Sequence, residues 1–344
     1  MAGIEQVAKL AGVSTATVSR ALSGKGQVSE RARAKVEKAV EELGYVPSSS
    51  AYTLATGRTN NIGVVLPFID RWYFSVILEA IETELIERDY DLTLYNLSGG
   101  IDQRKKVFSV FLPRKRVDGV LAVAVKLDDS ELAYLERTGK PLVGVGGLIP
   151  GAHSITIDDL AVGRMATEHL LSLGHSAIAC IGGVATTEMD FSQPTLRRNG
   201  WEKALKESKV AVRNDWFRGA DFTIAGGYAA GRELLKDPSD RPTGIVCASD
   251  EMGFGVIMAA KDLGIRVPED LSVVGVDDHD TSEFYGLTTV SQDVRAQGRH
   301  VAKVLIDLLE NHVAGEPVNI EAIERWPVKL VVRSSTAKVS KPAR

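Results

Sequence analysis

The first residues that could do chemistry form a short polar run at positions 14–20, STATVSR. The residues around it suit two helices that cross at a tight turn, because Ala8 is small at the crossing, Gly12 supplies the turn and Val18 closes a small core. The second helix then leaves the short polar side chains of the run on its free face, where they can approach base edges while Arg20 reaches a guanine or a phosphate. The pattern is typical of a helix-turn-helix that enters the DNA major groove, and a plain helical hairpin is the alternative.

Three short helices must position this face. Apolar residues at helical spacing predict a first helix over 4–10, and Ser14 is placed to cap a second helix that runs to about Leu22. Ser29 is placed to cap a third helix, which has Val36, Val40 and Leu43 on one face and ends before Gly44 and Pro47.

A polar stretch rich in Ser and Thr follows at 47–60 and is predicted to be a linker. Within it, Ser50–Thr56 could form one or two helical turns that expose Leu54. A helix of this length is marginal alone in water, so it would form only when something else stabilised it.

From Asn61 onward, short apolar runs alternate with amphipathic stretches, which predicts βαβ units and parallel sheets covered by helices. The expected strands are 62–66, 92–96, 117–125, 142–146, 177–183, 243–249 and 272–278. The expected helices are 73–89, 101–112, 129–138, 159–173, 195–207, 224–236, 250–263 and 293–312. These strands are too many for one modest sheet, and a break near 150–158 predicts two lobes.

Charge is distributed unevenly along the 344 residues. The formal net charge of −4 excludes a protein that coats a polyanion by bulk charge. Residues 1–60 nevertheless carry +3 and the remainder −7, so a small basic head precedes a large acidic body. The length favours two or three domains.

Several other function classes lack support in the sequence. Cys180 and Cys247 lie in apolar runs and are expected to be buried strand thiols. There is no secretory signal pattern at the N-terminus and no apolar stretch long enough to span a membrane, so a cytoplasmic, nucleoid-associated protein is predicted. Without a P-loop, a G-x-S-x-G elbow or a dinucleotide motif, no enzyme activity and no cofactor are expected. The run DDHD at 277–280 is interpreted as ligand-binding and solvated loop residues rather than a metal site.

The motifs together resemble the lactose/galactose-repressor (LacI/GalR) family of bacterial transcription regulators. The resemblance begins with GVSTATVSRAL and VSERARAKVEKAVEELGYVP, and continues through the linker SSSAYTLATGRTNNIGVVLP. It recurs in the family's order at HLLSLGH, RRNGW, SDEMGFGVIMAAKDLGIRVPEDLSVVGVDD, LTTVSQD and LVVRSST, and so covers almost the whole chain.

The resemblance implies an α/β fold with an N-terminal helix-turn-helix head and a two-lobed body like that of periplasmic binding proteins, with parallel sheets. The expected boundaries are 1–46 for the head, 47–60 for the hinge helix or linker, 61–336 for the effector-binding and dimerisation body, and 337–344 for a disordered tail. Within the body, the N-lobe is expected at about 61–157 and 292–318, and the C-lobe at about 158–291 and 319–336.

For function, the resemblance implies a homodimeric repressor that binds double-stranded operator DNA. Paired hinge helices would enter the minor groove, with Leu54 as the wedge between base pairs; a linker leucine packed on the body is the alternative. The expected DNA contacts are Ser14, Thr15, Ala16, Thr17, Ser19, Arg20, Ser29, Tyr45 and Leu54. The expected dimer surface is on the helix 73–89 and the segment 101–125, and a tail-made tetramer is not expected.

The resemblance also implies a small effector in the cleft between the lobes. Matching the family motifs gives Asp70, Trp72, Phe74, Arg197, Phe222, Ser249, Asp250, Asp277 and Gln292 as effector-binding residues, with Phe68, Arg71 and Tyr73 as further candidates from the first loop. Arginine and carboxylate groups suit sugar hydroxyls, and an aromatic ring can stack on a pyranose face.

The family pattern also has departures here. The chain has IDRWYF where the family commonly has D-x-x-N-P-F-F. GGLIPG follows LVGV (142–145), where many sugar-responsive relatives have a charged residue, and Ser249 stands where Asn is common. These positions set ligand specificity, so the effector is open: a mono- or oligosaccharide is favoured, and a purine or another corepressor is the alternative. A sugar-binding protein without DNA function would leave residues 1–60 unexplained.

Overall fold

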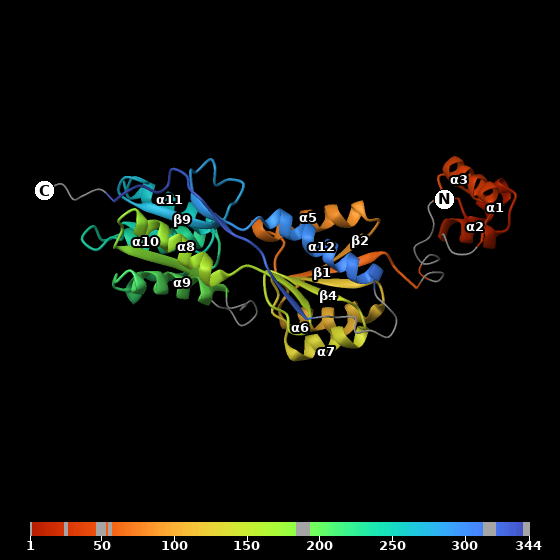
Figure 1. The fold of residues 1–344 in the computed structure, drawn as a ribbon, viewed down its shortest axis with the longest axis horizontal. Helices are drawn as coiled ribbons and strands as arrows, with labels where there is room; N and C mark the ends of the chain where they lie inside the picture. Colours follow the sequence, from red (N-terminus) through yellow and green to blue (C-terminus); the bar gives the residue numbers. More distant parts are fainter. Residues whose placement is uncertain are drawn as a thin grey trace. The chain divides into compact units, whose positions relative to one another are not determined.

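The computed structural model describes residues 2–23, 27–45, 53, 57–183, 193–311 and 321–339. The chain divides into two compact units (Figure 1). One unit contains Met1–Asn61 together with Lys115–Asp118, and the other contains Ile62–Arg114 and Gly119–Arg344.

The head is a three-helix unit made of α1 (Ile4–Ala11), α2 (Thr15–Ser23) and α3 (Glu30–Leu43). One valine from each helix is completely buried in its small core: Val7, Val18 and Val36. Gly12 ends α1 in the left-handed conformation (φ 65°), and Ser14 Oγ accepts the backbone N–H of Thr17 at the start of α2. These observations confirm the predicted helix-turn-helix.

The first lobe of the body is built on a six-stranded sheet. Its strand order is β11-β5-β4-β3-β1-β2. The bounds are β1 Asn61–Leu66, β2 Asp91–Asn96, β3 Gly119–Val123, β4 Leu142–Val145, β5 His153–Thr156 and β11 Ala322–Arg325. Helices α5 (Trp72–Glu87) and α12 (Val294–Asn311) cover one face, and α6 (Gly100–Lys106) and α7 (Asp129–Thr138) cover the other (Figure 1). The central strands are apolar and buried on both faces, as parallel strands under two helical layers must be.

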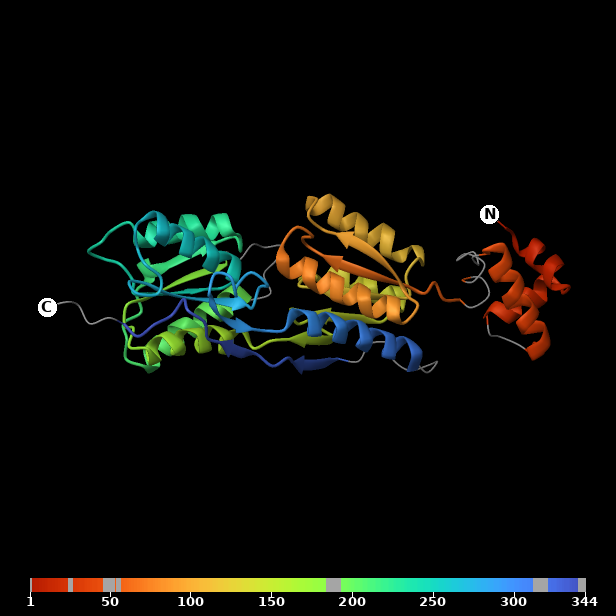
Figure 2. The same cartoon turned by 90° about the horizontal axis from the view of Figure 1, so that it is seen from above.

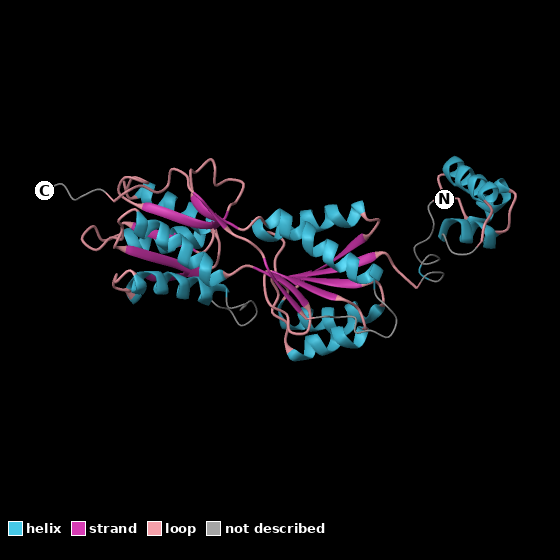
Figure 3. Ribbon diagram, viewed as in Figure 1, coloured by secondary structure: helices cyan, strands magenta, loops and turns pink. Residues whose placement is uncertain are grey.

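The second lobe repeats this plan (Figure 3). Its sheet has the order β12-β10-β9-β8-β6-β7. The bounds are β6 Ile178–Gly183, β7 Phe217–Ala220, β8 Gly244–Cys247, β9 Ser272–Asp277, β10 Thr288–Ser291 and β12 Lys329–Val331. One face packs on α8 (Asp159–Ser172) and α9 (Gln193–Glu207), and the other on α10 (Ile224–Leu235) and α11 (Asp250–Asp262).

The chain passes between the lobes three times, from β5 to α8, from β10 to α12 and from β11 to β12 (Figure 2). Two of these crossings are joined, because the Trp326 N–H donates to the carbonyl of Thr156 at 2.8 Å and the Arg325 guanidinium donates to the carbonyl of Ile157. The predicted α/β fold with parallel sheets is confirmed, with β12 antiparallel to β10 as the exception.

Several expectations about elements were wrong. The predicted break at 150–158 contains β5, after which the chain crosses to the second lobe. β7, β10, β11 and β12 were not predicted because each is short and includes polar or charged residues, unlike the apolar runs of β4 and β8. The helix expected at 101–112 ends as α6 at Lys106 and continues as one π-helical turn, Val107–Phe111. Cys180 and Cys247 are buried free thiols, as predicted.

Two details of the expected C-terminal boundaries also differ from the structure. The segment 319–336 was placed in the second lobe, yet β11 pairs with β5 in the first sheet, since a short strand carries no signal of which sheet it joins. The expected disordered tail starts with ordered residues, because the Ala337 N–H donates to Ser272 Oγ and the Val339 N–H donates to the carbonyl of Leu173.

The predicted linker helix and Leu54 lie outside the described residues, apart from Thr53. Within the described part of the chain, no helix combines the length and the apolarity needed to cross a membrane.

Candidate functional site

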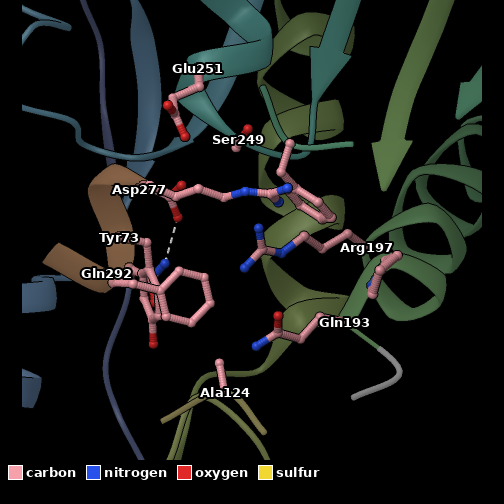
Figure 4. A pocket seen from close by; sticks show the side chains of 12 residues that line it. Tyr73, Ala124, Gln193, Arg197, Ser249, Glu251, Asp277 and Gln292 are labelled. Atoms are coloured by element: carbon pink, nitrogen blue, oxygen red, sulfur yellow. Dashed lines mark hydrogen bonds between the residues drawn. The ribbon is translucent and has the colours of Figure 1, made fainter. Parts of the chain in front are cut away.

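A pocket lies between the two lobes of the body (Figure 4). It encloses about 780 Å³ of space free of protein atoms, part of which is open to solvent. The first lobe contributes the N-terminus of α5 and the end of β3. The second lobe contributes α9 and the loops that follow β8 and β9 at their carboxyl ends, where ligands of open α/β sheets bind. The lining residues are Arg71, Tyr73, Phe74, Ala124, Gln193, Pro194, Arg197, Phe222, Ser249, Glu251, Asp277 and Gln292.

Arg197 is the buried cation of this pocket, with only 7% of its surface exposed. Its Nε donates to Asp159 Oδ1 at 2.8 Å, and its Nη1 donates to the carbonyl of Ala248 at 2.5 Å. The close packing of α8 on α9 fixes this position, because a Cβ at Gly163 would lie 2.1 Å from the carbonyl oxygen of Arg197. Although burial alone would lower it, Asp159 and Asp277 together raise the pKa of Arg197 above its ordinary value.

Asp277 is the carboxylate that faces Arg197 from the end of β9. Gln292 Nε2 donates to Asp277 Oδ1 at 2.5 Å, as Figure 4 shows. Burial raises the pKa of Asp277 to about 7, although Arg197 and the bond from Gln292 lower it. Its backbone φ of 117° is rare for a residue with a side chain, and backbone strain of this kind concentrates at functional sites.

Asn at position 277 is expected to flatten the pH dependence of stability. The carboxyl group titrates near 7 in the folded chain and near 3.9 when unfolded, so its stabilising contribution is full below about pH 4 and is lost as the pH rises through 7. Wild type should therefore lose on the order of 2 kcal/mol more than Asp277→Asn between pH 5 and 8. Chemical denaturation at each pH measures this, with Asp70→Asn at an exposed carboxylate as the control. Parallel curves for wild type and Asp277→Asn would contradict it.

Aromatic rings form the apolar part of the pocket: Tyr73 and Phe74 from α5, and Phe222 from the loop after β7. Room for the Phe222 ring depends on Gly183, since a Cβ there would lie 2.0 Å from the ring. Burial raises the pKa of the Tyr73 hydroxyl, which therefore stays protonated and can donate a hydrogen bond.

Six of the nine predicted effector residues line the pocket: Phe74, Arg197, Phe222, Ser249, Asp277 and Gln292. Their role in binding stays a prediction. Of the further candidates from the first loop, Arg71 and Tyr73 also line it and Phe68 does not, and Asp70 is exposed outside it.

Trp72 and Asp250 do not line the pocket, for different reasons. Trp72 stacks on His279 with ring centroids 4.6 Å apart and donates from Nε1 to Asp280 at 3.2 Å, so it joins the two lobes beside the pocket. Asp250 is completely buried behind the pocket and accepts hydrogen bonds from the hydroxyls of Ser282 and Thr289 and the backbone N–H of His279. Burial raises the pKa of Asp250 to about 8.

Four lining residues were missed: Ala124, Gln193, Pro194 and Glu251. Glu251 could have been found, since it follows Asp250 in the first turn of α11, at the carboxyl end of β8. Burial raises the pKa of Glu251, while Arg71 lowers it. Gln193 starts α9 next to undescribed residues, and nothing in its sequence context indicates a role.

The DDHD run at 277–280 is occupied by contacts within the body. Asp278 pairs with Arg333 at 2.6 Å, and Asp280 pairs with Arg295 at 3.1 Å. Over the ranges that the structure describes, no cluster of His, Cys, Asp and Glu side chains is arranged to hold a metal ion.

On the head, the predicted reading face is open to solvent. Ser14, Thr15, Ala16 and Arg20 are exposed, and Thr17 and Ser19 are partly buried. Ser29 caps α3 through a bond from the Ala32 N–H, and Tyr45 packs against the head core, so both have structural duties besides any contact with DNA.

A helix-turn-helix head followed by a two-lobed body with a pocket between the lobes defines an effector-controlled DNA-binding regulator. Residues 3–48 match the model of bacterial regulatory proteins of the lacI family, and residues 167–336 match a periplasmic binding protein-like domain. The chain is similar to the HTH-type transcriptional repressor PurR of Vibrio vulnificus (31% identity, covering 99% of this chain and 100% of the relative) and of Proteus mirabilis (35% identity, 98% and 97%).

Solved structures agree with this class. A lac repressor dimer bound to operator and the anti-inducer ONPF has a TM-score of 0.83 at 28% identity, covering 98% of this chain and 99% of the other. A complex of the transcriptional regulator CelR with cellobiose has a TM-score of 0.70 at 30% identity, covering 97% and 100%. The chain belongs to the lacI family of bacterial regulatory proteins. It is a DNA-binding transcriptional repressor controlled by a small effector, and not an enzyme.

Proposed function

We propose that this chain is a homodimeric repressor whose operator affinity is switched by a carbohydrate bound between its lobes. The observation that supports a carbohydrate effector is the density of hydrogen-bonding groups around a partly aromatic pocket. Arg197, Asp277 and Gln292 already bond to protein partners on one side and face the pocket, so they are held in place before a ligand arrives. Such groups match adjacent sugar hydroxyls, and Phe74 and Phe222 offer apolar faces for the ring.

A purine is the second candidate. Phe74 and Phe222 could also stack on a planar base, and the relatives at 31–35% identity include repressors named PurR. A neutral base, however, would use few of the pocket's polar groups, and the remainder would stay desolvated without partners. This cost favours a polyol, in keeping with the cellobiose bound to CelR and the ribose bound to a relative from Enterococcus faecium.

The switch itself would act on contacts that join the lobes around the pocket. Arg71 Nη1 donates to the carbonyl of Asp221 at 2.9 Å, and Gln193 Nε2 donates to the carbonyl of Gly146 at 2.5 Å. A ligand that adds its own hydrogen bonds to these contacts shifts the equilibrium toward the closed arrangement of the lobes. The shift is only as large as the difference between the ligand's affinities for the closed and the open arrangement. Whether that arrangement binds or releases DNA decides between corepressor and inducer.

Dimerisation is supported by exposed apolar residues on the surface predicted to pair. Ile86, Ile101 and Val110 lie in the predicted segments 73–89 and 101–125 and are 60%, 75% and 38% exposed. We expect a second copy of the chain to cover these side chains, and a two-fold dimer would present two heads to a pseudo-palindromic operator. Sedimentation equilibrium of the full chain measures this state. We infer from DNA binding that the protein acts in the cytoplasm, and nucleoid association stays a prediction.

A thermal-shift panel of glucose, cellobiose, ribose, hypoxanthine and guanine tests the effector class. A ligand at 100 times its Kd stabilises by ~2.7 kcal/mol, so one of the sugars should raise the Tm of the body by about 5–10 °C. The same sugar should change the affinity for operator DNA in an anisotropy titration. A shift with a purine alone would overturn the carbohydrate proposal, and no operator binding in any condition would overturn the repressor.

A further inference from the structure

An exposed basic loop lies where the linker joins the body. Arg114, Lys115 and Arg116 follow one another in the sequence, and all three are exposed. Lys115 takes the left-handed conformation (φ 55°), which bends the chain directly after the 3-10 turn Leu112–Arg114. In the part of the chain that the structure covers, none of the three forms an ion pair with a carboxylate.

Hydrogen bonds tie this loop to the linker. The Asp118 carboxylate accepts the backbone N–H groups of Thr59 and Asn60, each at 2.8 Å, and the Thr59 hydroxyl at 2.8 Å. Asn61 Nδ2 donates to the carbonyl of Arg116 at 2.9 Å. Accordingly, Lys115–Asp118 groups with the head-side unit although it is distant from it in sequence.

The loop stands out by charge. The chain after residue 60 carries −7, whereas three consecutive cations lie here beside Arg58, an exposed fourth. The carboxylate that follows the loop in the sequence, Asp118, is occupied by the backbone donors of the linker. Cations gathered on an otherwise acidic body, at the point where the chain leaves for its DNA-binding head, are complementary to a phosphate backbone.

We propose that Lys115 and Arg116 bind phosphates of the operator backbone, as a contact made by the body in addition to those of the head. The inference depends on the proposed function and on the expected hinge helix, in which Leu54 would enter the minor groove. Arg58 follows Leu54 by four residues, which span at most ~14 Å, and the loop is bonded to the residues that come next. Since phosphates carry no sequence information, this contact adds affinity and salt dependence without changing base preference.

The double variant Lys115→Gln with Arg116→Gln tests this in the full chain. Both side chains are exposed, and the Arg116 carbonyl that accepts Asn61 is retained, so the Tm should stay within 2 °C of wild type by roughly the tolerance of surface substitutions. Operator affinity should fall by about 10–100-fold at low salt. The slope of log K against log salt concentration should become shallower by ~0.9 for each phosphate that the variant no longer neutralises. The ratio of specific to non-specific binding and the effector-induced Tm shift should not change.

Lys261→Gln with Lys303→Gln is the matched control, since it removes two exposed positive charges elsewhere on the body. If the loop variant and this control show the same affinity and salt slope, the effect is one of net charge and the inference is wrong. If wild type binds its operator normally in that experiment, the repressor function stands. Failure of wild type to bind would instead overturn the proposed function itself.

Discussion

Glutamate at position 16 is expected to reduce specific operator binding by more than 100-fold. Ala16 is exposed on α2, on the face predicted to meet the bases, so the substitution leaves the head core of Val7, Val18 and Val36 untouched. A carboxylate placed against base edges and phosphates is repelled, and like-charge contacts at an interface cost several kcal/mol. Anisotropy with a fluorescent operator measures the loss.

Ala34→Glu is the matched control for this experiment. Ala34 is also exposed and helical in the head, but it lies on α3. It adds the same charge and should lower affinity several-fold at most, through long-range repulsion that salt screens. If both variants bind equally well, α2 is not the reading helix. The effector-induced Tm shift should be the same in both, because the pocket belongs to the other unit.

Removal of the Arg197 guanidinium should be the most damaging change in the pocket. Arg197→Ala leaves Asp159 buried without its cation and the carbonyl of Ala248 without its donor, which costs ~3–5 kcal/mol and lowers the Tm of the body by about 8–15 °C. Differential scanning calorimetry measures this loss.

Arg197→Lys separates stability from ligand binding. Lysine keeps a positive charge near Asp159 but lacks the planar fork that bonds to Asp159 and Ala248 together. The variant should fold, bind operator normally and respond to the effector only at concentrations ~10-fold higher or more. Unchanged effector affinity in Arg197→Lys would remove this residue from the binding site.

How much the sequence predicts depends on whether a pattern is local. The head is predictable in detail because its caps and turns are local. Ser14, Gly12 and Ser29 each bond to backbone groups only a few residues away in the sequence. The long apolar strands and the helices between them are predictable for the same reason. Arg197 and Asp277 were expected from the resemblance to the family's motifs, and both line the pocket. Asp277 ends a parallel strand, where ligands of such sheets bind, whereas Arg197 lies within α9.

Positions that depend on packing are not predictable in this way. Asp250 and Glu251 are adjacent acidic residues at the start of α11, and only the sheet behind them decides that the first is buried while the second faces the pocket. The Trp72 ring is of a type that could stack on a bound sugar, but the ring of His279 from the other lobe already stacks on it. The lobe to which β11 belongs is decided by pairing with β5, more than 160 residues away.

The late strands β11 and β12 have a consequence for biosynthesis. They follow the other described strands in the sequence and so emerge after them from the ribosome, yet β11 pairs with β5 in one sheet and β12 pairs with β10 in the other. Until residue 325 has been translated β5 lacks this partner, and until residue 331 β10 lacks its partner, although the finished fold buries the side chains of β10. Unpaired strand edges can pair with strands of other chains, so a chain released early would expose two such edges at once. Truncated products are therefore expected to aggregate or be degraded rather than persist as a half-folded regulator.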